Sequence, residues 1–91
     1  MAIQAGLTSI IILTFNALRF TQECLQSVQK FTPEPHELIL VDNASTDGTA
    51  DYLRSVREAR VIANPRNLGY ARGNNQGFAA AKGEYILFLN N

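Results

Sequence analysis

Short apolar segments rich in β-branched residues alternate along this chain with longer segments whose apolar residues recur at helical spacing. The apolar segments predict strands at residues 9–15, 37–41, 60–63 and 85–89. The longer segments predict helices at residues 17–31, 47–58 and 70–82. This alternation is typical of βαβ units, so we expect an α/β protein in which helices cover both faces of a parallel sheet.

Each predicted helix has one face that is expected to lie on the sheet. In the first helix this face comprises Leu18, Thr21, Cys24, Leu25, Val28 and Phe31. In the second helix it comprises Tyr52, Leu53 and Val56. In the third it comprises Ala71, Asn75, Phe78 and Lys82, and the following Gly83 is expected to end that helix. The segment 60–63 is short and flanked by charge, which predicts an edge strand.

Length and charge limit the classes of protein to which the chain can belong. Its 91 residues suit one small domain, residues 1–91. The 8 Lys and Arg residues balance 8 Asp and Glu residues, so bulk charge does not favour nucleic acid as a partner. Cys24 is the only cysteine, no basic region precedes the first apolar segment, and the apolar runs, such as residues 10–13, are too short to cross a membrane. We therefore expect a cytoplasmic protein with no transmembrane segment in this chain.

The fourth predicted strand is followed by only two residues, so one of its faces or edges is expected to lack a cover. This feature predicts that the domain is partial and that the chain is part of a longer protein. An uncovered strand also favours pairing with another chain. We therefore expect self-association through residues 85–89.

Polar segments follow three of the predicted strands, at the edge where an open parallel sheet binds its ligands. They are residues 14–16, 42–48 and 64–69. Their hydroxyl, amide and carboxylate groups suit a nucleoside. Asp42 directly follows a strand, so its carboxylate either points into this crevice or belongs to an ordinary turn. Asn75 lies on the predicted inward face of the third helix, where its amide either ties the preceding loop to the helix or faces the nucleotide.

Asn16, Ser45 and Asp47 are residue types that also cap helices, and for Ser45 and Asp47 capping is the favoured role. The sequence contains no P-loop, no G-x-G-x-x-G after the first strand and no His/Cys cluster suited to zinc. It therefore identifies no catalytic or metal-binding residue in this chain.

Three stretches together resemble the family 2 glycosyltransferases, which have the GT-A fold. They are residues 10–16, 40–49 and 67–91, and they span nearly the whole chain in the family's order and spacing. The last stretch is similar to that of bacterial, rhamnosyltransferase-like members that build cell-surface polysaccharides. The resemblance implies a three-layer α/β/α, Rossmann-like arrangement, the nucleotide-binding half of a truncated GT-A fold.

The resemblance also implies a set of substrate-binding residues. Residues 14–16 match the stretch that packs on the nucleobase, and Asp42 matches the aspartate that hydrogen-bonds the uracil or the ribose. The full set of candidates is Thr14, Phe15, Asn16, Asp42, Asn43, Asn67, Gly69 and Asn75. Their ligand would be a UDP- or dTDP-sugar.

The whole enzyme implied by the resemblance is an inverting glycosyltransferase with a saccharide or lipid-linked acceptor. It would use Mg or Mn and a carboxylate base, and other parts of it would reach the cytoplasmic face of the membrane. Two positions depart from the family. Thr14 replaces the usual Pro, and Asn90 replaces the first acid of the D-x-D motif, whose metal-binding acid would follow Asn91. We therefore expect residues 1–91 alone to hold no metal and to be inactive.

A second hypothesis is a non-catalytic, flavodoxin-like or receiver-like module, because such modules share the predicted order of elements. A receiver needs clustered acids after its first strand and a phosphorylatable Asp after its third. Asn16 and Asn64 occupy those regions, which argues against a receiver.

Overall fold

The computed structural model describes residues 2–90. Its elements are β1 (Gln4–Thr14), α1 (Leu18–Phe31), β2 (His36–Asp42), α2 (Thr49–Arg54), β3 (Ala59–Ala63), α3 (Tyr70–Ala80) and β4 (Gly83–Asn90). The predicted order of strands and helices is confirmed, although β1 begins earlier than expected and α2 is shorter. Among these described residues, no helix is both long enough and apolar enough to cross a membrane.

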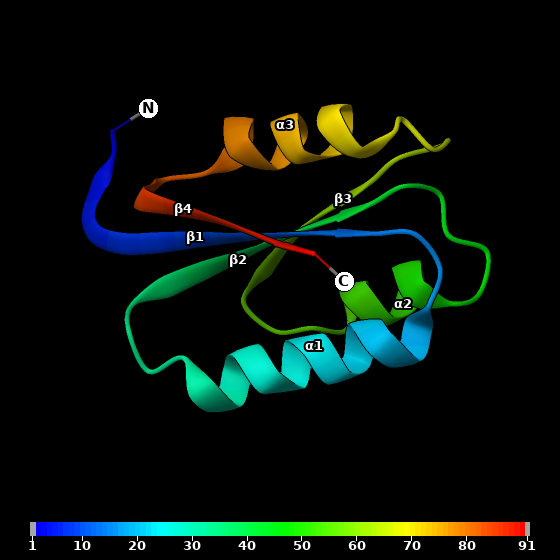
Figure 1. The fold of residues 1–91 in the computed structure, drawn as a ribbon, viewed down its shortest axis with the longest axis horizontal. Helices are drawn as coiled ribbons and strands as arrows, with labels where there is room; N and C mark the ends of the chain where they lie inside the picture. The colour runs from blue at the N-terminus through cyan, green and yellow to red at the C-terminus, as the bar shows by residue number, and fades with distance from the viewer. Residues whose placement is uncertain (1, 91) are drawn as a thin grey trace.

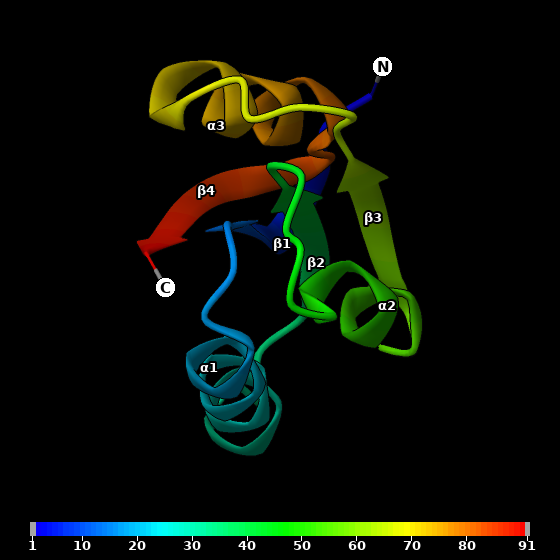
Figure 2. The same cartoon turned by 90° about the vertical axis from the view of Figure 1, so that its right-hand side faces the viewer.

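The four strands form one parallel sheet in the order β3-β2-β1-β4. Helices α1 and α2 lie on one face of this sheet and α3 lies on the other, which gives three layers (Figures 1 and 2). The predicted edge position of β3 is confirmed, and β4 forms the opposite edge. The fold class expected from the sequence is therefore the one observed.

The central strand β1 is buried on both of its faces. Its Ile10 and Ile12 belong to one core cluster with Leu25 of α1 and Leu53 of α2, whereas Ile11 belongs to a second cluster on the α3 side. Because a strand directs successive side chains to opposite faces, a strand covered on both faces needs apolar residues at every position. The unbroken apolar pattern of this segment therefore follows from its central place.

The predicted inward face of α1 is confirmed for Thr21, Leu25 and Val28, which are buried. The prediction was wrong for Phe31, which is 70% exposed. Phe31 is the last residue of α1 and lies three positions after Val28, about 60° around the helix from it. It therefore sits on the flank of the buried face, where the cover from the sheet ends.

The predicted inward face of α3 was wrong. Ala71, Asn75 and Phe78 are exposed, and the buried residues are Gly73, Asn74 and Gly77. A Cβ atom at Gly73 would lie 2.5 Å from a methyl carbon of Leu13, and one at Gly77 would collide with Ile11. The helix backbone itself therefore contacts β1, and glycine rather than an apolar side chain marks the inward face.

The expected helix-ending role of Gly83 was also wrong. Helix α3 ends at Ala80, and the next residue, Ala81, already has an extended backbone with φ −71° and ψ 139°. Gly83 is the first residue of β4, where a Cβ atom would lie 2.7 Å from the backbone of Leu7 and Ser9. Close approach between strands, not a left-handed turn, therefore requires glycine at this position.

Candidate functional site

Three polar loops meet at the edge of the sheet where the strands end. The register pairs Thr14 of β1 with Asp42 of β2, and Asp42 with Ala63 of β3, so these three strand ends lie level with one another. The loops that follow them lead to α1, α2 and α3 at one end of the molecule (Figure 1). The sheet therefore brings the predicted polar segments together at the edge where parallel sheets bind ligands.

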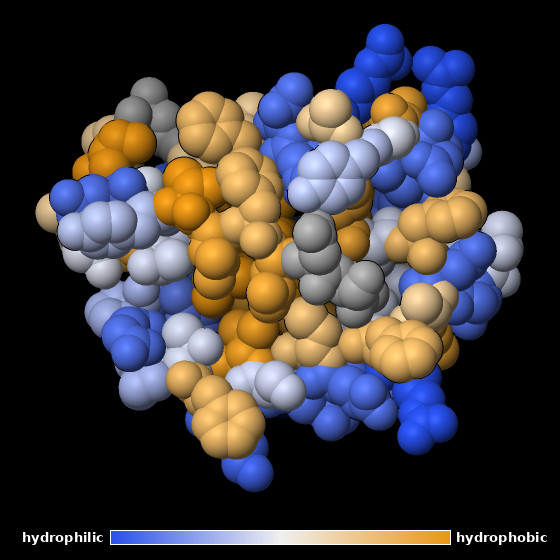
Figure 3. All heavy atoms as spheres, viewed as in Figure 1, coloured by the Kyte–Doolittle hydropathy of each residue, from blue (hydrophilic) through white to orange (hydrophobic). Residues whose placement is uncertain are grey.

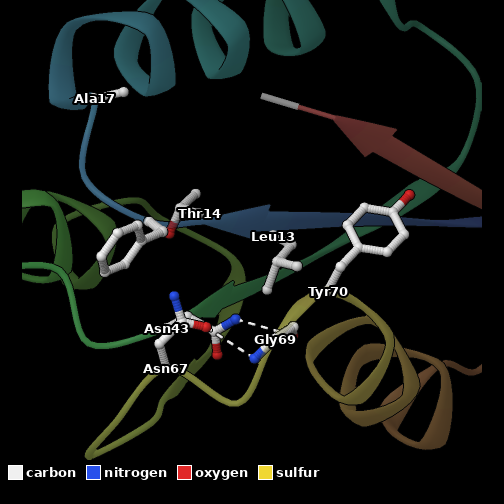
Figure 4. Close-up of a pocket in the computed structure, with 8 residues that line it drawn as sticks. Leu13, Thr14, Ala17, Asn43, Asn67, Gly69 and Tyr70 are labelled. Carbon is white, nitrogen blue, oxygen red and sulfur yellow. Dashed lines mark hydrogen bonds between the residues drawn. The ribbon is translucent and has the colours of Figure 1, made fainter.

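A pocket of about 440 Å³ opens between the first and third of these loops (Figure 4). Its lining contains five of the candidate residues: Thr14, Phe15, Asn43, Asn67 and Gly69. It also contains Leu13, Ala17 and Tyr70, which the sequence did not identify. The volume falls within the range that is usual for small-molecule sites.

Two exposed aromatic side chains belong to the pocket lining. Phe15 is 52% exposed and Tyr70 is 61% exposed. Tyr70 lies across the pocket from Thr14, with Leu13 between them (Figure 4). Aromatic rings pair with flat π systems by offset stacking, so this lining suits a nucleobase. The sequence signal for Tyr70 was an aromatic residue placed directly after a loop glycine, at the first position of a helix.

Asp42 lies behind the pocket and is not part of its lining. Its side chain is 1% exposed. Its Oδ1 accepts hydrogen bonds from the Thr14 hydroxyl at 2.7 Å and the Ser45 hydroxyl at 2.6 Å, and its Oδ2 accepts one from the Ser45 N–H at 2.9 Å. The carboxylate, at the end of β2, is thus bonded to the end of β1 and to the loop after β2.

The loops after β1 and β2 are joined by hydrogen bonds in both directions. The Asn16 N–H donates to the Ser45 hydroxyl oxygen at 2.6 Å, and the Thr46 N–H donates to Oδ1 of Asn16 at 2.7 Å. Asn16 therefore fixes the loop that carries Phe15 without itself lining the pocket. The favoured capping role of Ser45 was wrong, because its hydroxyl bonds a loop and a carboxylate rather than a helix end.

Asp47 is not at the N-cap position of either helix, which is Ala17 for α1 and Gly48 for α2, but it bonds the first N–H group of both. It accepts a hydrogen bond from the N–H of Leu18, at the start of α1, and another from the N–H of Thr49, at the start of α2. The hydrogen bond from the Thr49 hydroxyl has the largest effect and lowers the pKa of Asp47 below its usual value. Desolvation opposes it, and the hydrogen bonds from the backbone N–H groups of Leu18 and Thr49 add to the lowering. The carboxylate is therefore held in its charged form at the amino-terminal ends of both helices, where negative charge is favoured.

The described residues do not form a metal site. No group of three or more His, Cys, Asp or Glu side chains within residues 2–90 is arranged to hold an ion. The position expected to begin the D-x-D motif is Asn90, whose side chain lies outside the described part of the chain, as does Asn91. We therefore assign no step of any reaction to a metal held by this chain.

The family model described as glycosyl transferase family 2 matches residues 9–91. The chain belongs to glycosyl transferase family 2. A protein to which the chain is similar is the Escherichia coli protein named UDP-Glc:alpha-D-GlcNAc-diphosphoundecaprenol beta-1,3-glucosyltransferase WfaP. It is 34% identical over 86 residues, which cover 92% of this chain and 34% of that protein. The family match gives no support to the flavodoxin-like or receiver-like hypothesis.

Solved structures of glycosyltransferases share the fold. S. aureus TarS 1-349 in complex with UDP superposes with a TM-score of 0.83 and 29% identity, over 91% of this chain and 26% of that one. The mannosyltransferase PcManGT from Pyrobaculum calidifontis, in complex with GDP-Man and Mn2+, superposes with a TM-score of 0.82 and 25% identity, over 91% and 26%. The GT-A fold implied by the resemblance is thereby confirmed. This family 2 chain spans only 27% to 35% of the length of the first curated relatives that it matches.

Proposed function

We propose that residues 1–91 form the part of a family 2 glycosyltransferase that binds the nucleoside of a nucleotide sugar. The observation that carries this proposal is the pocket of about 440 Å³ at the carboxyl edge of the sheet, with Phe15 and Tyr70 in its lining. The nucleotides bound by TarS and PcManGT support a nucleoside diphosphate as the ligand. UDP or dTDP is the probe that we choose, because the resemblance implies a uracil or thymine base.

Within this proposal, the lining residues divide by chemistry. Phe15 and Tyr70 offer ring surfaces to the base, while the exposed amide of Asn67 offers a donor to its edge or to the ribose. The amide of Asn43 is already bonded to Gly69, Asn64 and Leu68, so Asn43 shapes the pocket wall. Asp42 acts from behind the lining, because its carboxylate fixes Thr14 and the loop after β2. We leave Asn75 out of the proposed site, since it is exposed and does not line the pocket.

For the whole protein, we propose transfer of a sugar from a nucleoside diphosphate sugar, with inversion, to a saccharide or lipid-linked acceptor in polysaccharide or cell-envelope synthesis. The name of WfaP, with its undecaprenol-linked acceptor, supports this class of reaction. The Mn2+ of PcManGT supports a divalent ion in the whole enzyme. Residues 2–90 supply neither a metal site nor an assigned base, so this chain contributes binding and orientation. A cytoplasmic location, where nucleotide sugars serve as donors, belongs to the same proposal.

We also propose that the chain pairs with a second copy through β4. This strand forms an edge of the sheet, and its Tyr85, Leu87 and Phe88 are exposed. Apolar side chains gather on the face seen in Figure 3, between α3 above and α1 below. A two-fold pairing of β4 with itself would bring apolar side chains of both copies together and satisfy the backbone groups along the free edge.

Titration of the isotope-labelled chain with UDP and dTDP, followed by NMR, tests nucleotide binding. We expect millimolar nucleotide to shift signals of residues 14–17, 42–48 and 67–70, and few others. Tyr70→Ala is expected to weaken binding, whereas Phe20→Ala serves as the control. Phe20 is 64% exposed on α1 and lies outside the pocket lining. Shifts spread over the whole chain, or none at millimolar nucleotide, would contradict the proposed site.

A further inference from the structure

We infer that Asn64 and Gln76 are positioning residues, which hold Asn43 and the adjoining pocket wall in place without touching the ligand. The wall is the part of the lining formed by Asn67, Gly69 and Tyr70. Neither Asn64 nor Gln76 lines the pocket. Their role in nucleotide binding rests on the proposed function, whereas their role in holding the wall can be tested without any ligand.

The two side chains form a reciprocal amide pair between the start of the third loop and α3. Nδ2 of Asn64 donates to Oε1 of Gln76 at 2.8 Å, and Nε2 of Gln76 donates to Oδ1 of Asn64 at 2.8 Å. Nδ2 of Asn64 also donates to Oδ1 of Asn43 at 2.9 Å. One chain of hydrogen bonds therefore runs from Asn43, after β2, through Asn64, after β3, to Gln76 on α3.

Backbone groups decide the direction of every bond in this chain. Nδ2 of Asn43 donates to the carbonyl oxygen of Gly69 at 3.1 Å, and a carbonyl can only accept. The Oδ1 of Asn43 must then face the other way, toward Asn64 and the N–H of Leu68. Asn64 must therefore turn its NH2 group toward Asn43. This leaves one N–H and the carbonyl oxygen of Asn64 to be bonded, and an amide such as Gln76 supplies both an acceptor and a donor.

Burial makes this arrangement hard to replace with water. Asn43 is 2% exposed and Asn64 is 9% exposed. A buried polar group that loses its partner keeps its desolvation cost without compensation. Close packing adds a steric limit, because a Cβ atom at Gly73 would lie 3.3 Å from Nδ2 of Asn43. The close approach of α3 at Gly73 thus restricts the orientation of the Asn43 side chain.

The pair acts on the ligand through the pocket lining. Asn43 is itself a lining residue, and its bond to the Gly69 carbonyl fixes the wall at the point where Gly69 adopts φ 86°. Loss of the Gln76 bonds releases Asn64, and the freed amide of Asn64 no longer holds Oδ1 of Asn43. The wall then samples other positions, so a ligand must order it at a cost in affinity.

Variants at Gln76 separate this role from general stability. Gln76→Met keeps the length of the side chain and removes both hydrogen bonds, whereas Gln76→Glu keeps an acceptor for Nδ2 of Asn64. Gln26→Met is the matched control, since Gln26 is exposed on α1. We expect Gln76→Met to weaken UDP binding about fivefold, the equivalent of roughly one hydrogen bond. Gln76→Glu sets a carboxylate oxygen against Oδ1 of Asn64 in place of the Nε2 donor, so it should also weaken binding. Gln26→Met should leave the dissociation constant unchanged.

The ligand-free readout is the NMR spectrum of the same variants. The side-chain amide of Asn43 and the N–H of Gly69 should shift and exchange faster in Gln76→Met, while the amides of β1 and β2 stay in place. Unchanged Asn43 and Gly69 signals in Gln76→Met overturn the positioning role. If that variant does not fold, the same comparison between Gln76→Glu and Gln26→Glu decides the question.

Failure of the proposed function looks different from failure of this inference. If the unaltered chain binds no UDP, the proposed nucleotide site is wrong, and the Asn43 and Gly69 signals alone judge the positioning role. If the unaltered chain binds UDP and Gln76→Met binds it equally well, the site stands and the inference falls.

Discussion

The hydroxyl of Thr14 donates a 2.7 Å hydrogen bond to Oδ1 of Asp42, so the carboxyl ends of β1 and β2 are joined by side chains as well as by backbone. Both residues are 1% exposed. The family resemblance places a proline at the position of Thr14, and proline has no hydroxyl to offer. In this chain the departure from the family pattern therefore creates an additional internal donor for the carboxylate.

Replacing Thr14 with Val should destabilise the chain, because valine keeps the shape of the side chain and removes the donor to buried Asp42. We expect the free energy of unfolding to fall by about 1–3 kcal/mol, the usual cost of an unsatisfied buried group. Thr14→Ser keeps the hydroxyl and should recover much of the loss. Urea unfolding followed by circular dichroism measures both variants, and a Val variant as stable as the unaltered chain would show that this bond adds nothing.

Replacing Ala17 with Gly should stabilise the chain. Ala17 precedes α1 with φ 59° and ψ 49°, a left-handed conformation that costs a non-glycine residue roughly 1–2 kcal/mol. Glycine adopts it freely but loses more entropy on folding, so we expect a net gain of about 0.5–1 kcal/mol. The control is Ala79→Gly, at an exposed position inside α3, where the same change should cost about 1 kcal/mol. Thermal melts in which both variants move in the same direction would refute the conformational argument.

Asp47 should make stability depend on pH in acid. Its pKa in the folded chain is lowered, first by the Thr49 hydroxyl. The charged carboxylate therefore adds stability above its unfolded-state pKa of about 3.9, and this contribution is lost as the pH falls through the lower, folded-state pKa. We expect Asp47→Asn to lower the melting temperature near neutral pH and to flatten the acid limb of the profile. Glu34→Gln, at an exposed position before β2, is the control and should not lower the melting temperature near neutral pH.

Self-association through β4 should be visible by sedimentation equilibrium at tens of micromolar protein. We expect a dimer or larger species, because β4 has a free edge and exposed apolar side chains. Leu87→Lys places a charge on this strand and should shift the equilibrium to monomer, whereas Arg60→Lys on β3 should not. A clean monomer for the unaltered chain would mean that the β4 edge does not pair in solution.

The sequence predicted those parts of the fold in which the buried positions are occupied by apolar side chains. The apolar run at residues 10–13 of β1 indicated a central strand, because burial on both faces requires apolar residues at successive positions. Helix α3 was different. Its contact with β1 is made by Gly73 and Gly77, which contribute no hydrophobic signal, so periodicity selected Phe78 instead.

The candidate site was predicted at the level of loops and less well at the level of side chains. Strand ends in a parallel sheet fall at one edge, which is why Thr14, Asn43 and Asn67 were found. The placement of Asp42 depends on Thr14, 28 residues away, and a pattern along the chain does not show which donors a buried carboxylate will meet. Tyr70 was missed because only the residues of α3 that were expected to face the sheet were considered, whereas Tyr70 is the first residue of this helix and faces the pocket.

Because all four strands are parallel, the loops after the strands lie at one end of the molecule and the loops after the helices lie at the other. The loops 15–17, 43–48 and 64–69 leave the sheet at the pocket, whereas the returns at 32–35, 55–58 and 81–82 lie at the far end. In the proposed function, substitutions in the first set of loops change ligand binding. The second set lies outside the pocket lining, so that end is the place to insert a reporter or a surface tether.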